Sequence, residues 1–319
     1  MRPRTPAGSP PSPAPFPHPR APVRVAALAC LLAVPACSDG DGDDQADRAA
    51  VVTTTSTSRP TGSFTSLTYN VAGLPQGVNP DQSPEQHQPL ISPLLNAYDV
   101  VLVQEDFGFY TNVLRAQAEH DHLSEPHPGP AVLNPIARAE AAVGDGLNIH
   151  SRLAIGDLER VPWTECGAAS ADCLALKGFA GTELSLAEGV AIDLYTLHVE
   201  AGGEDSALRG DDLDQLAAHL AERSPGAVII GGDWNLEYAD DPDGDQLRAF
   251  LSVTGLRDVC DVLDCGADDD VIDRFLFRSD DDVTLTPTRH RFERETFVDP
   301  AGLPLSDHDP LAVDWSWST

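Results

Sequence analysis

Single polar residues of the kinds that enzymes use follow or precede several apolar segments of this sequence. A charged group at the end of a buried strand is costly unless it is paired or bound to a metal ion. Strand ends are also where sheet-based enzymes place their active sites. We therefore treat as one candidate site the polar residues at such positions, which are Asn70, Glu105, His198, Asp233, Asn235, Asp273 and the loop Ser306-Asp307-His308-Asp309-Pro310.

Each of these residues also has a structural explanation. Asn70 is of a type common in turns, His198 could be a structural histidine, and Asp233 with Asn235 could cap a helix. It is their joint occurrence at successive strand ends that indicates a catalytic site.

The elements that would position these residues alternate between strand and helix from Phe64 onward. Apolar runs and alternating patterns predict strands at Phe64–Ala72, Tyr98–Glu105, Leu147–Ile155, Phe179–Leu186, Val190–Val199, Ala227–Gly231, 271–277, 283–287 and Leu311–Trp315. Helical spacing predicts helices at 84–98, 109–120, 206–223 and 243–254. Two sheets packed together with helices outside them fit this pattern.

Four short motifs occur in a fixed order along the chain: Val103-Gln104-Glu105, Gly232-Asp233-Trp234-Asn235, Ile272-Asp273-Arg274 and Ser306-Asp307-His308-Asp309-Pro310. From Thr68 to Pro310 the sequence resembles the endonuclease/exonuclease/phosphatase superfamily, the DNase I-like phosphoesterases. The resemblance implies an α/β fold, a four-layer α/β/β/α sandwich of two packed mixed sheets with outer helices. It also implies a metal-dependent phosphoric ester hydrolase that acts on a phosphodiester.

The resemblance further implies a role for each polar residue. Glu105 would be the main ligand of a Mg²⁺ ion, helped by Asn70 and Asp307, with Mn²⁺ or Ca²⁺ as possible substitutes. His308 would act as the general base, and Asp273 would hold its ring in the required tautomer.

Three other positions would contact the phosphate or the attacking water. Asp233 and Asn235 would orient the water and hydrogen-bond the phosphate. His198 would donate a hydrogen bond to a non-bridging oxygen and stabilise the developing charge.

The segment Cys166–Phe179, CGAASADCLALKGF, resembles a loop of secreted bacterial sphingomyelinases and contains Lys177, the chain's one lysine. We predict that Lys177 binds substrate. The predicted function is hydrolysis of a phosphodiester bond in a phospholipid headgroup, of the sphingomyelinase or phospholipase C type. The alternative is a secreted nuclease or a phosphoinositide phosphatase with the same metal site.

The charge of the chain favours the lipid alternative. Asp and Glu number 51 against 20 Lys and Arg, a formal charge of −31, so nucleic acid is an improbable partner and a zwitterionic headgroup is compatible. A monomer is expected. A non-enzymatic surface module that retains the fold is a further alternative. It would require that candidate site residues be replaced, and none of them is.

The N-terminal part of the chain has the composition of an export signal. Residues 1–36 combine arginines with the apolar run VAALACLLAVPA, which is too short to span a bilayer, and so predict a signal peptide. Cys37 follows directly and resembles the acylated cysteine of a bacterial lipoprotein, although ordinary secretory cleavage is the alternative. Residues 37–63 are expected to form a flexible tether and residues 64–319 a single catalytic domain. The predicted location is outside the cell, as a surface lipoprotein or a secreted bacterial protein.

Four cysteines remain in the predicted domain. Cys166 pairs naturally with Cys173, and Cys260 with Cys265, if the compartment is oxidising. A zinc site is the weaker alternative, because the two pairs are not accompanied by paired histidines.

Overall fold

The computed structural model describes residues 59–127, 141–167, 172–203, 205–223, 225–237, 239, 242–266 and 271–319. The predicted signal peptide, Cys37 and most of the predicted tether lie outside the described residues. We describe the unit that runs from Ser56 to the end of the chain.

Two six-stranded sheets form the centre of this unit. The first has the order β11-β12-β1-β2-β4-β3 and the second β5-β6-β7-β8-β10-β9. Both are mixed, because β1 runs parallel to β2 and β7 parallel to β8, while the other pairs are antiparallel. The first sheet comprises β1 (Thr61–Asn70), β2 (Val100–Gln104), β3 (His122–Leu123), β4 (Asn148–Ser151), β11 (Thr284–Phe292) and β12 (Leu311–Ser318). The second comprises β5 (Glu159–Pro162), β6 (Gly178–Ala187), β7 (Val190–His198), β8 (Val228–Asp233), β9 (Arg257–Asp258) and β10 (Asp273–Arg278).

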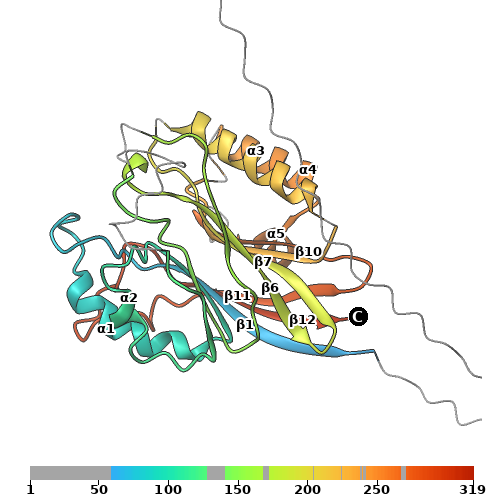
Figure 1. Ribbon diagram of the computed structural model, residues 1–319, viewed down its shortest axis with the longest axis horizontal. Helices are drawn as coiled ribbons and strands as arrows, with labels where there is room; N and C mark the ends of the chain where they lie inside the picture. Colours follow the sequence, from blue (N-terminus) through green and yellow to red (C-terminus); the bar gives the residue numbers. More distant parts are fainter. Residues whose placement is uncertain are drawn as a thin grey trace, which may run out of the picture. The chain divides into compact units, whose positions relative to one another are not determined.

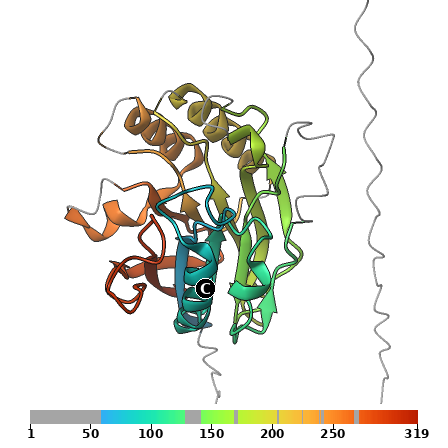
Figure 2. The same cartoon turned by 90° about the vertical axis from the view of Figure 1, so that its left-hand side faces the viewer.

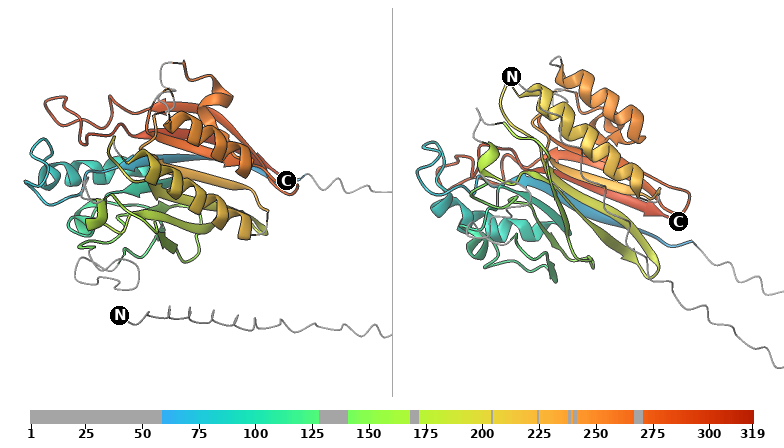
Figure 3. Two further views of the ribbon diagram at one scale, coloured as in Figure 1. Left: turned by 90° about the horizontal axis from the view of Figure 1, so that it is seen from above. Right: turned by 45° about the horizontal axis from the view of Figure 1, so that its top comes forward.

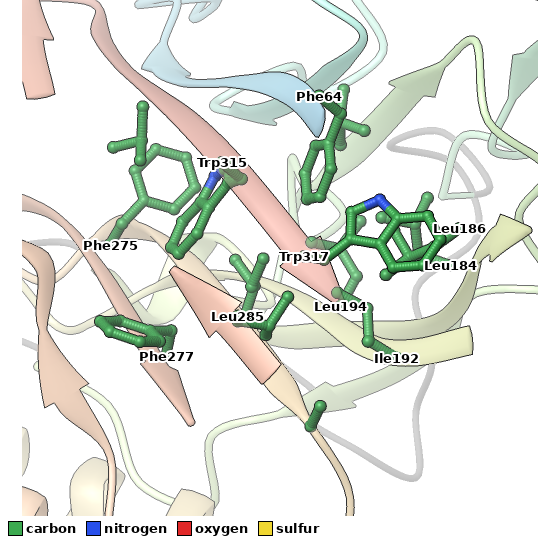
Figure 4. Packing of buried hydrophobic residues seen from close by; sticks show 14 of the residues in the cluster. Phe64, Leu184, Leu186, Ile192, Leu194, Phe275, Phe277, Leu285, Trp315 and Trp317 are labelled. Carbon is green, nitrogen blue, oxygen red and sulfur yellow. The ribbon is translucent and has the colours of Figure 1, made fainter. Parts of the chain in front are cut away.

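The inner faces of the two sheets share one apolar core. Strand alternation turns Val100 and Leu102 of β2 inward, where they join Leu194 and Ile229 of the second sheet in one buried cluster. Figure 4 shows Trp315 of the first sheet beside the rings of two residues of β10, Phe275 and Phe277, with ring centroids 6.2 and 5.5 Å away. The sheets are therefore packed face to face.

Helices cover both outer faces. Ile91 of α1 (Pro84–Leu94) and Leu114 of α2 (Thr111–Leu114) pack on Val101 and Val103, the outward residues of β2. On the other side α3 (Ser206–Glu222) and α4 (Asp243–Thr254) lie side by side over the second sheet, as Figures 1 and 3 show. Figure 2 shows blue β1 and the yellow-green strands β6 and β7 in separate layers. The predicted four-layer α/β/β/α sandwich is confirmed.

Several local predictions differ from the structure. The predicted helix 109–120 is wrong beyond its first turn, because only Thr111–Leu114 is α-helical. The two-residue strands β3 and β9, the strand β5 and the helix α5 (Val259–Leu263) have no counterpart among the predicted elements, since segments this short carry too little periodicity. Two 3₁₀ turns, Leu95–Ala97 and Asp172–Leu174, complete the described elements.

The domain also begins earlier than predicted. Strand β1 starts at Thr61, whose register partner is Ser318, and continues to the pair Thr68 and Leu311. The last three residues of the predicted tether, Thr61–Ser63, are thus part of the first sheet.

A buried histidine on β4 makes the stability of the fold depend on pH. His150 is fully buried, and neither ring nitrogen has a hydrogen-bond partner in the described chain. Burial, with repulsion from Arg115 and His120, lowers the pKa of His150 from 6.5 to about 3. The folded protein therefore keeps this ring neutral, whereas the unfolded chain takes up a proton below about pH 6.5.

We expect the free energy of unfolding to fall as the pH falls from about 6.5 towards 3. In His150→Leu this loss should be less steep by up to about 1.4 kcal/mol per pH unit. Urea denaturation at a series of pH values measures it, with the more exposed His122→Gln as the control. Equal slopes for wild type and His150→Leu would contradict the expectation.

Candidate active site

The candidate residues come together because the parallel strand pairs of both sheets end at the same edge. In the first sheet Asn70 lies opposite Gln104, with Glu105 next along the chain. In the second sheet Asp233 lies opposite both His198 and Asp273. The loop before β12 joins this edge through Ser306, whose hydroxyl donates a 2.7 Å hydrogen bond to the carbonyl of Asn70.

A buried polar bridge fixes the two sheets to each other beneath the site. The Gln104 side-chain amide donates to the hydroxyl of Thr68 in its own sheet at 3.1 Å and to that of Thr196 in the other sheet at 2.9 Å. All three residues are fully buried. Such a satisfied buried network specifies one arrangement of the sheets and hence of the strand ends above it.

His308 lies between two carboxylates. Its Nδ1 is 2.8 Å from Asp273 Oδ2, and its Nε2 is 3.6 Å from Asp233 Oδ2. Burial alone lowers the pKa of His308, but the charges of Asp273 and Asp233 outweigh burial and raise the pKa to about 10. Ligand atoms of all three residues lie within 4.8 Å of one another, so this cluster is also close enough to hold a cation.

Asn70 connects this cluster to Glu105. Its Nδ2 donates to Glu105 Oε1 at 3.1 Å and to Asp233 Oδ2 at 3.0 Å. Its Oδ1 accepts the backbone N–H of Ala72 at 3.0 Å. The atom that would ligate a metal thus holds the backbone instead, and the metal-binding role of Asn70 remains a prediction that requires the amide to rotate or to share Oδ1.

Glu105 has the environment of a metal ligand. Burial raises the pKa of its carboxyl, and the hydrogen bond from Asn70 and the positive charge of Lys177 only partly oppose this. Glu105 and Asp307 line one small hollow of about 80 Å³. Two carboxylates on one small hollow are the hard oxygen donors that Mg²⁺ or Ca²⁺ prefers, so these residues fit a divalent cation.

Two predicted phosphate-binding residues lie deeper than expected. His198 is 2% exposed, and its Nε2 lies 3.2 Å from Asp233 Oδ2. Burial, followed by the charges of Lys177 and His308, lowers the pKa of His198 well below 6.5, so the ring is neutral. Lys177 is 4% exposed and forms a 2.8 Å ion pair with Asp172. Their contacts with substrate remain predictions, whereas His198 contacts Asp233 and the charge of Lys177 acts on the Asp233 carboxylate.

Asn235 is held at the rim of the site. Its backbone N–H donates to Asp233 Oδ1 at 3.1 Å, and its Nδ2 donates to the carbonyl of Val199 at 2.9 Å. The structure thus brings together every predicted catalytic and metal-binding residue at one edge.

Sequence reasoning gave no role to two residues that the structure places at the site. Asp172 pairs with Lys177 and accepts a hydrogen bond from the N–H of Ala201 at 2.6 Å. It lies inside the segment Cys166–Phe179 that resembles the sphingomyelinase loop, and this was the available signal. Gly73 packs against the backbone of Glu105. The sequence signal for Gly73 was its position directly after the predicted strand Phe64–Ala72, next to the candidate site.

Both predicted disulfides are present. Cys166 is bonded to Cys173 and Cys260 to Cys265. The first joins Cys166 to Cys173, the residue next to Asp172.

Comparisons with known proteins show which sequences and folds this chain resembles. No protein-family model matches the sequence. Proteins named sphingomyelinase from Mycobacterium tuberculosis and Mycobacterium bovis are 33% identical over 289 residues, which is 86% of this chain and 57% of theirs. The chain therefore spans little more than half the length of these relatives.

Solved structures share the fold at lower identity. Sphingomyelinase C from Streptomyces griseocarneus has a TM-score of 0.58 at 19% identity and covers 79% of this chain and 99% of its own. A Staphylococcus aureus beta toxin mutant with bound magnesium ions has a TM-score of 0.56 at 16% identity, with coverage of 79% and 99%. D. rerio TDP2 complexed with a single-strand DNA product has a TM-score of 0.59 at 18% identity, with coverage of 79% and 98%.

Fold and site together define a DNase I-like α/β sandwich, as the motifs predicted. Within that class, the chain is a homologue of the mycobacterial proteins named sphingomyelinase.

The close approach of Gly73 to Glu105 gives a test of the site's construction. A Cβ atom on Gly73 would lie 2.3 Å from the Glu105 carbonyl oxygen, so Gly73→Ala must displace the turn that carries the Glu105 carboxylate. We expect Gly73→Ala to lower the free energy of unfolding by about 1–3 kcal/mol and to weaken Mg²⁺ binding. Urea denaturation and calorimetric titration measure the two effects.

The matched control is Gly156→Ala, where the added Cβ meets only Thr182 Oγ1, at 3.4 Å. Unchanged Mg²⁺ affinity in Gly73→Ala would show that the Glu105 turn does not set the cation site.

Proposed function

We propose that this protein is a Mg²⁺-dependent phosphodiesterase that cleaves the headgroup phosphodiester of a phospholipid. The observation that carries the proposal is the continuous chain of contacts His308–Asp233–Asn70–Glu105. These contacts connect the His308 imidazole, which is held by Asp273, to the small hollow lined by Glu105 and Asp307. The name of the mycobacterial relatives, sphingomyelinase, supports a phospholipid as substrate.

Glu105 and Asp307 would hold the cation, with Asn70 beside them. When bound, a divalent cation supplies the positive charge that a phosphate needs in order to accept a nucleophile. That charge would also repel a proton on the nearby His308 ring and so lower the pKa of His308 from its raised value.

His308 would take a proton from the attacking water at Nε2. Its Nδ1 is engaged by Asp273, which fixes the tautomer and leaves Nε2 as the reactive nitrogen. Asp233 and Asn235 would orient the water and the phosphate at the rim. The neutral His198 ring would hold Asp233 in place, and Lys177 would bring positive charge close to Asp233 and the phosphate.

The substrate assignment rests on charge as well as on relatives. A chain of formal charge −31 repels a polyanion and offers little material for the basic groove that nucleic-acid binding requires. The likeness to TDP2 makes a nuclease the second candidate, since that structure contains a DNA product.

We further propose that residues 1–36 direct export and that Cys37 carries a lipid anchor. The apolar run before Cys37 supports this reading. Among the described residues, no helix is both long and apolar enough to cross a bilayer.

Substrate assays of two active-site variants test the proposal. We expect wild-type protein with Mg²⁺ to release phosphocholine from sphingomyelin, and EDTA to stop the reaction. His308→Ala should reduce turnover by about 10²–10⁴-fold, because it removes the proton acceptor. Glu105→Gln should abolish turnover and weaken Mg²⁺ binding in a calorimetric titration.

The exposed Glu119→Gln variant is the matched control for loss of one carboxylate and should behave as wild type. Unchanged turnover in His308→Ala would remove the general-base assignment. Mg²⁺-dependent nicking of supercoiled plasmid that Glu105→Gln abolishes, without release of phosphocholine, would favour the nuclease.

A further inference from the structure

Asp106, the residue directly after Glu105, is a buried carboxylate that has no role in the proposed function. Its Oδ1 accepts a hydrogen bond from the hydroxyl of Thr111, the first residue of α2, and its Oδ2 accepts one from Asn148 Nδ2 at 2.8 Å. Its backbone N–H donates to the carbonyl of Gly146 at 2.9 Å. Asp106 therefore ties the turn after β2 to three separate segments of the chain.

The backbone of Glu105 is held in a conformation that its surroundings must impose. Its φ is 60°, in the left-handed region that residues with a side chain rarely adopt. A Cβ atom on Gly146 would lie 3.1 Å from Glu105 Cα, and one on Gly73 would lie 2.3 Å from the Glu105 carbonyl oxygen. Glu105 is thus enclosed on both sides, and the direction of its side chain depends on how the turn is held.

A chain of polar contacts extends from Asp106 to the second sheet. Asn148 lies on β4, and its Oδ1 accepts a hydrogen bond from Nη2 of Arg160, on β5, at 3.3 Å. Arg160 Nη1 is itself held by both carboxylate oxygens of Asp145, at 2.7 Å each. Because Oδ1 of Asn148 faces the guanidinium, its Nδ2 faces Asp106. Such a network fixes the amide, and through the amide the carboxylate, in one arrangement.

These contacts separate Asp106 from the carboxylates proposed to hold the cation. Both of its oxygens are engaged by donors within the protein, whereas Glu105 and Asp307 line the small hollow. Asp106 can therefore influence a bound cation through the position of Glu105 without contacting the cation itself.

We propose that Asp106 is a positioning residue that holds the turn of Glu105 and thereby sets the affinity of the site for its divalent cation. The inference deepens the proposed function and rests on it for Glu105 as the ligand. It predicts that loss of the Asp106 carboxylate weakens cation binding although the set of ligands is unchanged.

The chain offers a matched control at the other end of the same strand. Asp99 directly precedes β2, and its Oδ2 accepts hydrogen bonds from the N–H and the hydroxyl of Thr65 at 2.8 and 3.0 Å. Asp99→Ala therefore also removes a carboxylate that accepts two hydrogen bonds, but far along β2 from Glu105.

Calorimetric titration of the full chain with Mg²⁺ tests the inference without turnover. We expect Asp106→Ala to bind Mg²⁺ about 10-fold more weakly than wild type, the scale of effect seen for residues that orient metal ligands. Asp99→Ala should bind Mg²⁺ as wild type does. High Mg²⁺ should restore turnover in Asp106→Ala but not in Glu105→Gln, because only the first variant retains the ligand.

A milder pair of variants keeps the test available if Asp106→Ala does not fold. Thr111→Val removes one of the two donors to Asp106 and keeps the shape of the side chain, and Thr65→Val does the same beside Asp99. Thr111→Val should weaken Mg²⁺ binding, and Thr65→Val should not.

Wild-type Mg²⁺ affinity in Asp106→Ala and Thr111→Val, or an equal loss in Asp99→Ala, would overturn the inference. Weakened Mg²⁺ binding in Asp106→Ala, together with a wild type that hydrolyses no phospholipid, would reject the proposed function alone. Lipid hydrolysis that EDTA stops, together with wild-type Mg²⁺ affinity in Asp106→Ala, would reject the role of Asp106 alone. A wild type that binds no Mg²⁺ would overturn both.

Discussion

The concentration of negative charge at one edge of the sandwich is the constraint on which the rest of the site depends. Glu105, Asp233, Asp273 and Asp307 meet there because strand ends of both sheets coincide. Like charges in partly desolvated surroundings are unfavourable unless each finds a counter-charge or a donor. His308, Asn70, His198 and Lys177 supply these to the first three carboxylates, and a divalent cation would complete the balance.

Backbone strain is concentrated at the same edge. The described chain has four non-glycine residues with positive φ, and three of them follow strands that end here: Ala72 at 48°, Glu105 at 60° and Asn235 at 49°. Such conformations cost about 1–3 kcal/mol each and persist only where the surroundings impose them. The inter-sheet bridge of Gln104 and the close packing of Gly73 on the Glu105 backbone lie beside the turns after β1 and β2.

Local sequence patterns predicted most strands and helices and the polar residues at strand ends, and the family resemblance predicted the four layers. A long apolar strand such as Val190–His198 can be recognised from its composition. A polar residue directly after an apolar run, such as Glu105, can be recognised from its position. Contacts between sheets could not be predicted in this way. The amide of Asn70 turned towards Asp233 and the depth of His198 both depend on packing across separate strands. Short edge strands such as β3 and β9 form only because a longer neighbour pairs with them.

The pairing of Thr61 with Ser318 fixes the end of the first sheet at which the chain enters the domain. Strand β1 runs ten residues, about 33 Å, from that pair to Asn70. Any segment that precedes Thr61 therefore enters at the pole opposite the carboxylates.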